Sequence, residues 1–327
     1  MYRIRATTVV RRASRAVPRI PFHAIITRPY FQQSRFYLHI ALGRGAARIS
    51  LPPGVIVGVL RRWIVSPAFY RNIGLISAAA GGIYLCNLEQ VPMTGRWRFN
   101  IISSSIEQKL GVVGVEQVRQ EYGEQFIPED DPRVRTVKNV LAKLLPYAEG
   151  EFLKDMNWEV IVIECLDNNT FVYPGGKIFF NTGLLALCKD EDDVAVILGH
   201  EIAHIVARHS AERLSQGFLV SLILLSLSLF DTSLPSWKYL INRFLRMPAS
   251  RMQEAEADYI GLMMMTQGCY KPQTAIDFWA RMKEMQSQQP TQLLDTHPSH
   301  HDREENFREW LPEAMEKAQA SECSGTS

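Results

Sequence analysis

The sequence predicts an α+β fold that is mostly helical, contains one small antiparallel sheet and is preceded by a membrane-spanning helix. Apolar residues recur at helical spacing over several long stretches. Three short runs rich in β-branched and aromatic residues, between residues 158 and 181, are separated by turn-forming residues and predict strands. Residues 72–88 carry no charge. The 327 residues suffice for one domain of ordinary size with a buried core, plus additional segments.

The first 88 residues have an unusual charge pattern. They contain thirteen Arg but no Lys, Asp or Glu, so the rest of the chain holds 23 basic and 34 acidic residues, a net charge of −11. An Arg- and Ser-rich start without acidic residues is typical of a mitochondrial transit peptide, which we predict at residues 1–50. A basic arm that binds nucleic acid or an anionic membrane is the alternative. The complete lack of acidic residues favours the targeting segment, and no nucleic-acid partner is expected.

The uncharged residues 72–88 are just long enough to cross a bilayer as a helix. The small residues at 78–82 would equally suit a buried helix of a soluble domain, which is the alternative. Arginines precede this segment and Glu89 follows it. The positive-inside rule therefore places the rest of the chain in the intermembrane space, although Arg96 and Arg98 weaken the bias.

Helical and strand patterns follow one another along the rest of the chain. A connecting helical segment is expected at 89–130, and packing helices are expected over 106–149 with a loop at 128–132. Strands joined by tight hairpins are predicted at 158–164, 170–173 and 177–181. Further helices are predicted at 194–214, 250–266, 273–286 and 303–317, before a polar tail at 319–327. Acidic residues at 190–193 cap the first of these helices.

The cysteines give little information. Their number is odd, and no CxxC pair occurs among Cys86, Cys165, Cys188, Cys269 and Cys323. The sequence therefore indicates neither a disulfide framework nor a thiolate metal site, and free thiols are predicted.

A metal-binding pattern lies on the predicted helix 194–214. His200, Glu201 and His204 belong to the sequence HEIAH, which fits HExxH. Four residues advance a helix by about 400°, so both imidazoles lie on one face and can bind one ion. Glu201 lies beside them, placed to accept a proton from water rather than to bind the metal. The helix is otherwise largely apolar, and buried ionisable groups need partners or a metal.

A catalytic zinc ion usually takes three protein ligands, so a third is expected downstream. Glu254 and Glu256, on the next helix that carries a motif, are the candidates. Glu254 shares a helical face with Asp258, so we predict Glu254 as the ligand and Asp258 as a carboxylate that orients a histidine. Glu256 points away from both. His209 follows His204 by five residues, about 140° around a helix, and is predicted to be an exposed polar residue. A solvated acidic helix face is the alternative.

Three motifs in this order resemble a known family. HEIAH, then EAEAD at 254–258, then THPSHHDR at 296–303 resemble the marks of the HtpX and CAAX-prenyl-protease family of zinc metallopeptidases. LEQVPMTGRWRFN and SRMQEAEADYIGLMMM are more closely similar to the mitochondrial OMA-type peptidases of that family. The likeness covers about residues 130 to 310 and implies a zincin-like (gluzincin) domain, which we place at 131–318, with one Zn²⁺ per chain.

The resemblance also implies roles for further residues. His297 would stabilise the oxyanion and Arg303 would hold the site together, whereas His300 and His301 would be surface residues. An edge strand that pairs with the substrate backbone is expected at Lys177, Ile178, Phe179, Phe180 and Asn181. The implied activity is ATP-independent cleavage of inner-membrane proteins during stress and quality control. The expected partners are these substrates and the lipid bilayer, and a homo-oligomer is possible.

An apolar run at 217–230 separates the two motif helices. A single crossing of the membrane there would put His204 and Glu254 on opposite sides, and fourteen residues are short for a span. We therefore expect a membrane-dipping segment, or a hairpin together with 234–245. A core helix is the alternative.

Two other functions stay open at this stage. One is a membrane-anchored scaffold with a structural zinc site, which the open coordination position beside Glu201 disfavours. The other is a prenyl-protein protease of the endoplasmic reticulum, which resembles the same motifs. That family has many more membrane spans, and the Arg-rich start favours mitochondria.

Overall fold

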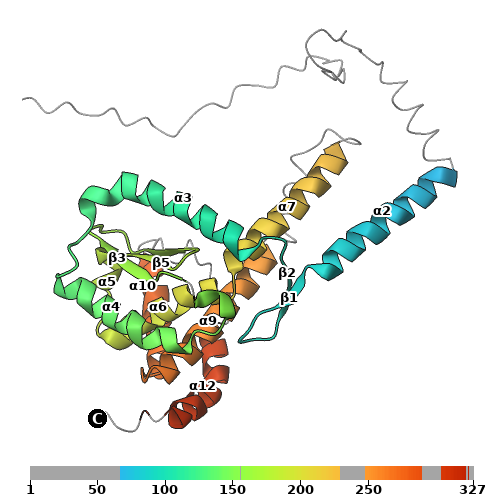
Figure 1. Cartoon of the computed structure of the whole chain (residues 1–327). Coiled ribbons are helices and arrows are strands. Elements are labelled where there is room, and N and C mark those ends of the chain that lie inside the picture. Colours follow the sequence, from blue (N-terminus) through green and yellow to red (C-terminus); the bar gives the residue numbers. More distant parts are fainter. Residues whose placement is uncertain (1–66, 155, 229–246, 289–302, 322, 324–327) are drawn as a thin grey trace, which may run out of the picture. The chain divides into compact units, whose positions relative to one another are not determined.

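The computed structural model describes residues 67–154, 156–228, 247–288, 303–321 and 323 (Figure 1). The chain divides into two compact units, 1–75 and 76–327. Of the first unit only the beginning of helix α2, Pro67–Cys86, is described, and the elements below belong to the second unit. The predicted transit peptide at 1–50 lies outside the described residues.

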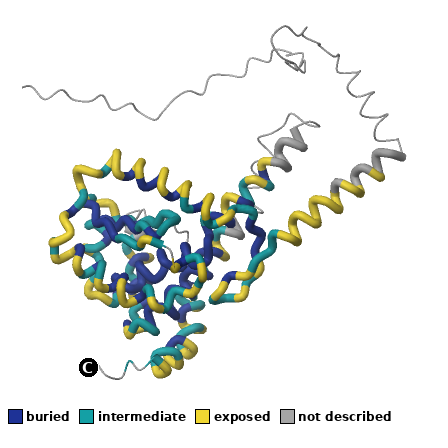
Figure 2. The backbone as a smooth tube through the Cα atoms, in the orientation of Figure 1, coloured by how far each residue is buried: buried dark blue, intermediate teal, exposed yellow. Residues whose placement is uncertain are grey.

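Helix α2 covers most of the predicted membrane segment 72–88. Beyond residue 73 nearly all of its characterised side chains are exposed, which Figure 2 shows as a long yellow stretch. Among the helices that the structure describes, none has both the length and the apolar character needed to cross a bilayer. The helix itself is confirmed, and its crossing of a membrane stays a prediction.

A hairpin and two capped helices precede the main sheet. Strands β1, Leu88–Gln90, and β2, Trp97–Phe99, pair in antiparallel orientation. Helix α3, Ser104–Tyr122, begins where the Ser103 side chain accepts the Ile106 N–H. Helix α4, Pro132–Leu144, begins with Pro at its first position after Asp131 accepts the Arg133 N–H. The predicted helices and the loop between them are therefore confirmed, whereas the start of the connecting segment 89–130 is a hairpin rather than helical.

The main sheet is mixed rather than antiparallel, so that part of the fold prediction is wrong. Its strands are β3, Glu159–Ile163, β4, Thr170–Tyr173, and β5, Lys177–Asn181, in the order β3–β5–β4. The turn at 174–176 joins β4 and β5 as the predicted antiparallel hairpin, with Gly175 and Gly176 at positive φ. Because β5 lies between its partners, it runs parallel to β3. Local turn residues predict the hairpin but not the order of the strands.

Helix α6, Glu191–Val206, forms the centre of the core (Figure 1). Asp190 accepts the Asp193 N–H at 3.1 Å and caps it, as predicted. Every residue from Asp193 to Val206 is buried. Helices α4, α9 (Met247–Gln267) and α10 (Gln273–Gln288) pack against α6, and α12 (Arg303–Ala320) packs against α9.

Helices α6 and α9 approach each other most closely at two glycines. A Cβ added at Gly261 would lie 2.8 Å from the backbone carbon of Gly199 and from the nitrogen of His200. Only glycine allows backbones to come so near. This crossing brings the acidic residues of α9 beside the histidines of α6.

The predicted continuous helix 194–214 is wrong, because it is broken after Val206. Arg208 has φ 46, and α7, His209–Ser228, starts at the next residue. The Arg208 guanidinium donates to Glu107 at 2.9 Å and to the Ile102 carbonyl at 2.7 Å. These partners lie about a hundred residues earlier in the chain, so tertiary contacts hold a conformation that the local sequence does not predict. The predicted helices at 250–266, 273–286 and 303–317 are confirmed by α9, α10 and α12.

The apolar run 217–230 continues α7 as far as Ser228, and its last residues and the segment 234–245 lie outside the described residues. The prediction that all cysteines are free is wrong for one pair. Cys269, just after α9, forms a disulfide with Cys323, just after α12. Because 54 residues separate them, only the packing of α12 on α9 brings them together. Cys86, Cys165 and Cys188 are free.

Candidate metal centre

Three metal-binding side chains converge between α6 and α9. His200 and His204 lie one turn apart on α6, with their Nε2 atoms 3.1 Å apart. From α9, Glu254 places Oε2 3.2 Å from His200 Nε2 and Oε1 3.6 Å from His204 Nε2. All three residues are buried. The structure therefore brings together the three predicted ligands.

The donor set fits a tetrahedral metal ion. Ligand atoms about 2.0 to 2.1 Å from a zinc ion lie about 3.3 Å from one another. The observed separations of 3.1, 3.2 and 3.6 Å bracket this value. Among the described residues the donors are two imidazoles and one carboxylate, and three protein ligands is the number found in catalytic rather than structural zinc sites.

His200 is oriented by Asp258, as predicted. Its Nδ1 lies 2.9 Å from Asp258 Oδ1, which leaves Nε2 for the metal. Arg303 donates to Asp258 through Nε at 2.6 Å and Nη2 at 3.0 Å, and its guanidinium stacks 3.7 Å from the ring centroid of Trp279. In the metal-free chain, burial disfavours the charged form of His200, but bonds to Asp258 and Glu254 raise its pKa to about 9.

Glu201 follows His200 directly in α6 and is 1 % exposed. It does not belong to the three-ligand cluster. A carboxylate held in the same buried layer, one residue from a metal ligand, suits a group that moves a proton rather than one that binds the metal.

His209 is not exposed, and this prediction is wrong. It is fully buried, with Nδ1 2.8 Å from His204 Nδ1 and Nε2 2.9 Å from Glu256 Oε2. The assumed rotation of 140° requires one continuous helix. The break at Arg208 instead turns His209 back toward His204. Burial lowers the pKa of His209, although Glu256 opposes this effect.

Glu256 points away from the ligand cluster, as predicted, but it is buried and has its own partners. Burial would raise its pKa, but hydrogen bonds from His209, Arg96 and Thr94 outweigh burial and hold the pKa at about 2. Arg96 also binds Glu212 through two hydrogen bonds, of 3.0 and 2.7 Å. Burial would lower the pKa of Arg96, but the two carboxylates raise it.

Sequence reasoning missed this second polar group around the ligands. One signal was present, because Thr94 and Arg96 lie within LEQVPMTGRWRFN, a stretch that carries the family resemblance. The resemblance does not predict which residues Thr94 and Arg96 contact, since 160 residues separate Arg96 from Glu256.

The predicted substrate strand 177–181 is not an edge strand, so this prediction is wrong. Strand β5 is bonded to β3 on one side and to β4 on the other, which leaves its backbone no free edge. The sheet ends instead at β3 and β4, and β4 is the strand that packs against α6. His297, like His300 and His301, lies outside the described residues, so its role stays a prediction.

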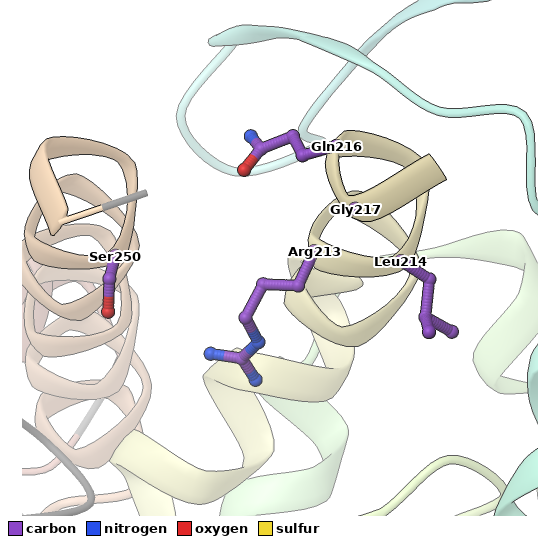
Figure 3. Close-up of a pocket in the computed structure, with 5 residues that line it drawn as sticks. All are labelled: Arg213, Leu214, Gln216, Gly217 and Ser250. Carbon is purple, nitrogen blue, oxygen red and sulfur yellow. The ribbon is translucent and has the colours of Figure 1, made fainter. Parts of the chain in front are cut away.

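A separate cavity of about 330 Å³ lies between α7 and the start of α9. Figure 3 shows Arg213 reaching from α7 toward the space between the two helices, with Ser250 on the facing helix. None of the residues that line it belongs to the ligand cluster.

Comparison with known proteins agrees with this geometry. Residues 131–311 match peptidase family M48, which is more than half of the chain. The chain belongs to this family. Mitochondrial metalloendopeptidase OMA1 of Schizosaccharomyces pombe is 39% identical over 258 residues, covering 78% of this chain and 76% of the relative. Its namesake in Saccharomyces cerevisiae is 34% identical, covering 78% of each chain. The human metalloendopeptidase OMA1 is 30% identical over 73% of this chain and 49% of its own length.

The M48 assignment confirms the resemblance inferred from the three motifs. The chain is a mitochondrial metalloendopeptidase of the OMA type. As an M48 peptidase it requires a bound metal ion, for which His200, His204 and Glu254 are the donors that the structure brings together.

Proposed function

We propose that this M48 peptidase uses one zinc ion to cleave membrane proteins at the mitochondrial inner membrane during quality control and stress, without ATP. The observation that carries the proposal is the buried cluster of His200, His204 and Glu254, whose donor atoms lie within 4.8 Å of one another, next to Glu201. Nitrogen and carboxylate donors in a tetrahedral arrangement favour zinc over magnesium or calcium, which prefer more oxygen ligands.

In this mechanism Glu201 is the general base. Zinc, when bound, supplies a Lewis acid that polarises the scissile carbonyl and acidifies the attacking water. Glu201 accepts the proton of that water and passes it to the leaving amine. Asp258, held by Arg303, keeps the Nδ1 proton on His200 and so fixes the ring. His297 is proposed to donate a hydrogen bond to the oxyanion.

The substrate is proposed to add as a strand to β4. In an antiparallel pair, residues alternate between those bonded to the partner strand and those whose backbone faces outward. Asn181 donates its N–H to the Asn169 carbonyl at 3.1 Å, so this alternation turns the backbone groups of Thr170 and Val172 away from β5. An extended peptide could bond to them beside helix α6.

The β4 proposal has a direct test. Val172→Pro removes the outward N–H without breaking the β4–β5 ladder, so kcat/KM for peptide cleavage should fall about 10-fold, the effect of about one lost hydrogen bond. Val172→Ile keeps the N–H and should cleave like the wild type. Equal activity in both variants, with zinc content unchanged, would remove β4 as the substrate strand.

The location rests on the sequence at both ends of α2. The Arg-rich start, without acidic residues before Glu89, supports a transit peptide and a matrix-facing N-terminal side. The catalytic domain would then face the intermembrane space, with the bilayer as partner and self-association possible. Alkaline extraction of mitochondria, and protease access after rupture of the outer membrane, test this placement. Extraction into the soluble fraction contradicts it.

The catalytic assignment is tested with Glu201→Gln. This variant should bind one zinc ion per chain, as the wild type does, and lose cleavage of casein or of a reconstituted membrane protein. Glu191→Gln, at an exposed position of the same helix, is the matched control and should keep activity. Continued proteolysis by Glu201→Gln would exclude Glu201 as the base, and a wild-type protein without metal would overturn the proposed function.

A further inference from the structure

The two ligand histidines are held by different groups. The Nδ1 atom of His200 meets the carboxylate of Asp258 directly, at 2.9 Å. The Nδ1 atom of His204 meets Nδ1 of His209, at 2.8 Å. A second imidazole therefore takes the place of the acid that usually orients a metal-bound histidine.

The protonation of His204 and His209 follows from their contacts. His204 can bind a metal through Nε2 only if its proton lies on Nδ1, which then donates to His209 Nδ1. A neutral His209 accepts that bond when its own proton lies on Nε2, where Glu256 Oε2 accepts it at 2.9 Å. Both rings and the carboxylate are buried, and each of these bonds has one donor and one acceptor. The chain of hydrogen bonds therefore runs from His204 through His209 to Glu256.

Glu256 is held in turn by a segment far away in the sequence. The turn between β1 and β2 supplies Thr94, whose hydroxyl donates to Oε1, and Arg96, which donates to Oε2 through Nε at 2.9 Å and Nη2 at 2.7 Å. Arg96 is fixed at the same time by Glu212 of α7. The turn is anchored by Val91, which is fully buried and exchanges backbone hydrogen bonds with Arg96 and Gly95.

We propose that His209, Glu256 and Arg96 form a chain of positioning residues that orients His204 for metal binding and couples the metal centre to the β1–β2 hairpin. This inference rests on the proposed function, since it concerns the ligands of the same metal ion. The hairpin directly follows α2 in the sequence. Because Arg96 belongs to the hairpin, a displacement of the hairpin would remove the cation that binds Glu256 and weaken the contacts that orient His204. Metal affinity then reports the state of the segment that connects the N-terminal part to the peptidase domain.

The first experiment separates the effects of the two hydrogen bonds that His209 makes, one with His204 and one with Glu256. Asn places an amide oxygen near the position of Nδ1 and keeps the acceptor for His204, whereas Gln places its amide near Nε2 and keeps only the donor to Glu256. Phe keeps neither. The Kd for zinc, measured on the full chain by competition with a chromogenic chelator, should rise least for His209→Asn, more for His209→Gln and about 10- to 100-fold for His209→Phe. Equal affinity in all three variants would overturn the proposal.

The second experiment tests the coupling to the hairpin. Arg96→Met removes the cation that binds Glu256 and should raise the zinc Kd about 10-fold, although Arg96 is not one of the candidate ligands. Arg98→Met is the matched control, because Arg98 is also an arginine of the hairpin but binds Glu89 rather than Glu256. It should leave the zinc Kd within about 2-fold of the wild type. Equal losses in both variants would mean that the hairpin has only a structural role.

Circular dichroism of the metal-free proteins checks that each variant folds. If Arg96→Met does not fold, Arg96→Lys keeps the charge with fewer donors and should show a smaller rise of the zinc Kd in the same direction. The outcomes also separate the two proposals. A wild-type chain without zinc defeats the proposed function, whereas a zinc-binding, active chain whose His209 and Arg96 variants bind zinc as tightly defeats only the coupling.

Discussion

The His200 side and the His204 side of the metal centre each contain one carboxylate and one arginine, but these residues come from different parts of the chain. On the His200 side, Asp258 and Arg303 form one carboxylate and one cation, and the carboxylate touches the ligand directly. On the His204 side, Glu256 and Arg96 repeat this pair, but His209 stands between the carboxylate and the ligand. The first side joins helices α6, α9 and α12, while the second extends to the hairpin after α2. The difference suggests a fixed side and a side that other parts of the chain can adjust.

The largest expected effect is on the stability of the His200 side. Arg303 is 5 % exposed and binds Asp258 beside Glu254, so Arg303→Met removes a buried positive charge from beside two buried carboxylates. We expect the free energy of unfolding of the metal-free protein to fall by about 3 kcal/mol or more, measured by urea denaturation. Lys283→Met, at an exposed ion pair with Glu304, should change it by less than about 1 kcal/mol. Similar effects of both changes would contradict a buried role for Arg303.

The next difference is in metal affinity. Asp258→Asn removes the charge that touches His200, and the zinc Kd should rise about 10- to 100-fold. Glu256→Gln acts through one more residue and should raise it less, by about 10-fold or below. Chelator competition on both variants under identical conditions measures the ratio. A larger effect of Glu256→Gln would reverse the assignment of the fixed and the adjustable side.

The smallest expected effect is on the loss of stability at acidic pH. The pKa of Glu256 is lowered from 4.5 to about 2, so its ion pair contributes stability above pH 4.5 that is lost as the pH falls toward 2. Glu256→Gln has no such group, and its urea midpoint should fall less steeply over that interval than the wild-type midpoint. Parallel curves for both proteins would show that Glu256 keeps an ordinary pKa. The measurement isolates the His209 side, because Asp258 is unchanged in both proteins.

Local patterns in the sequence determined the ligand set. HExxH spacing places His200 and His204 on one helical face, and the same geometry separates Glu254 and Asp258 from Glu256. Capping by Asp190 and the turn at Gly175 and Gly176 are equally local, and both were predicted correctly. Such features depend on a few consecutive residues, so a single sequence is enough to find them.

Tertiary structure alone decided the rest, since the deciding partners lie far apart in the chain. Arg208 keeps its positive φ because Glu107 and the Ile102 carbonyl hold it, and that break buries His209 against His204. Strand β5 takes the centre of the sheet because β3 pairs with it from across a loop. The Cys269–Cys323 disulfide and the contact of Arg96 with Glu256 likewise join distant segments. The candidate metal ligands could therefore be read from local spacing, whereas the contacts of His209, Glu256 and Arg96 beside them could not, because those contacts depend on which elements pack together.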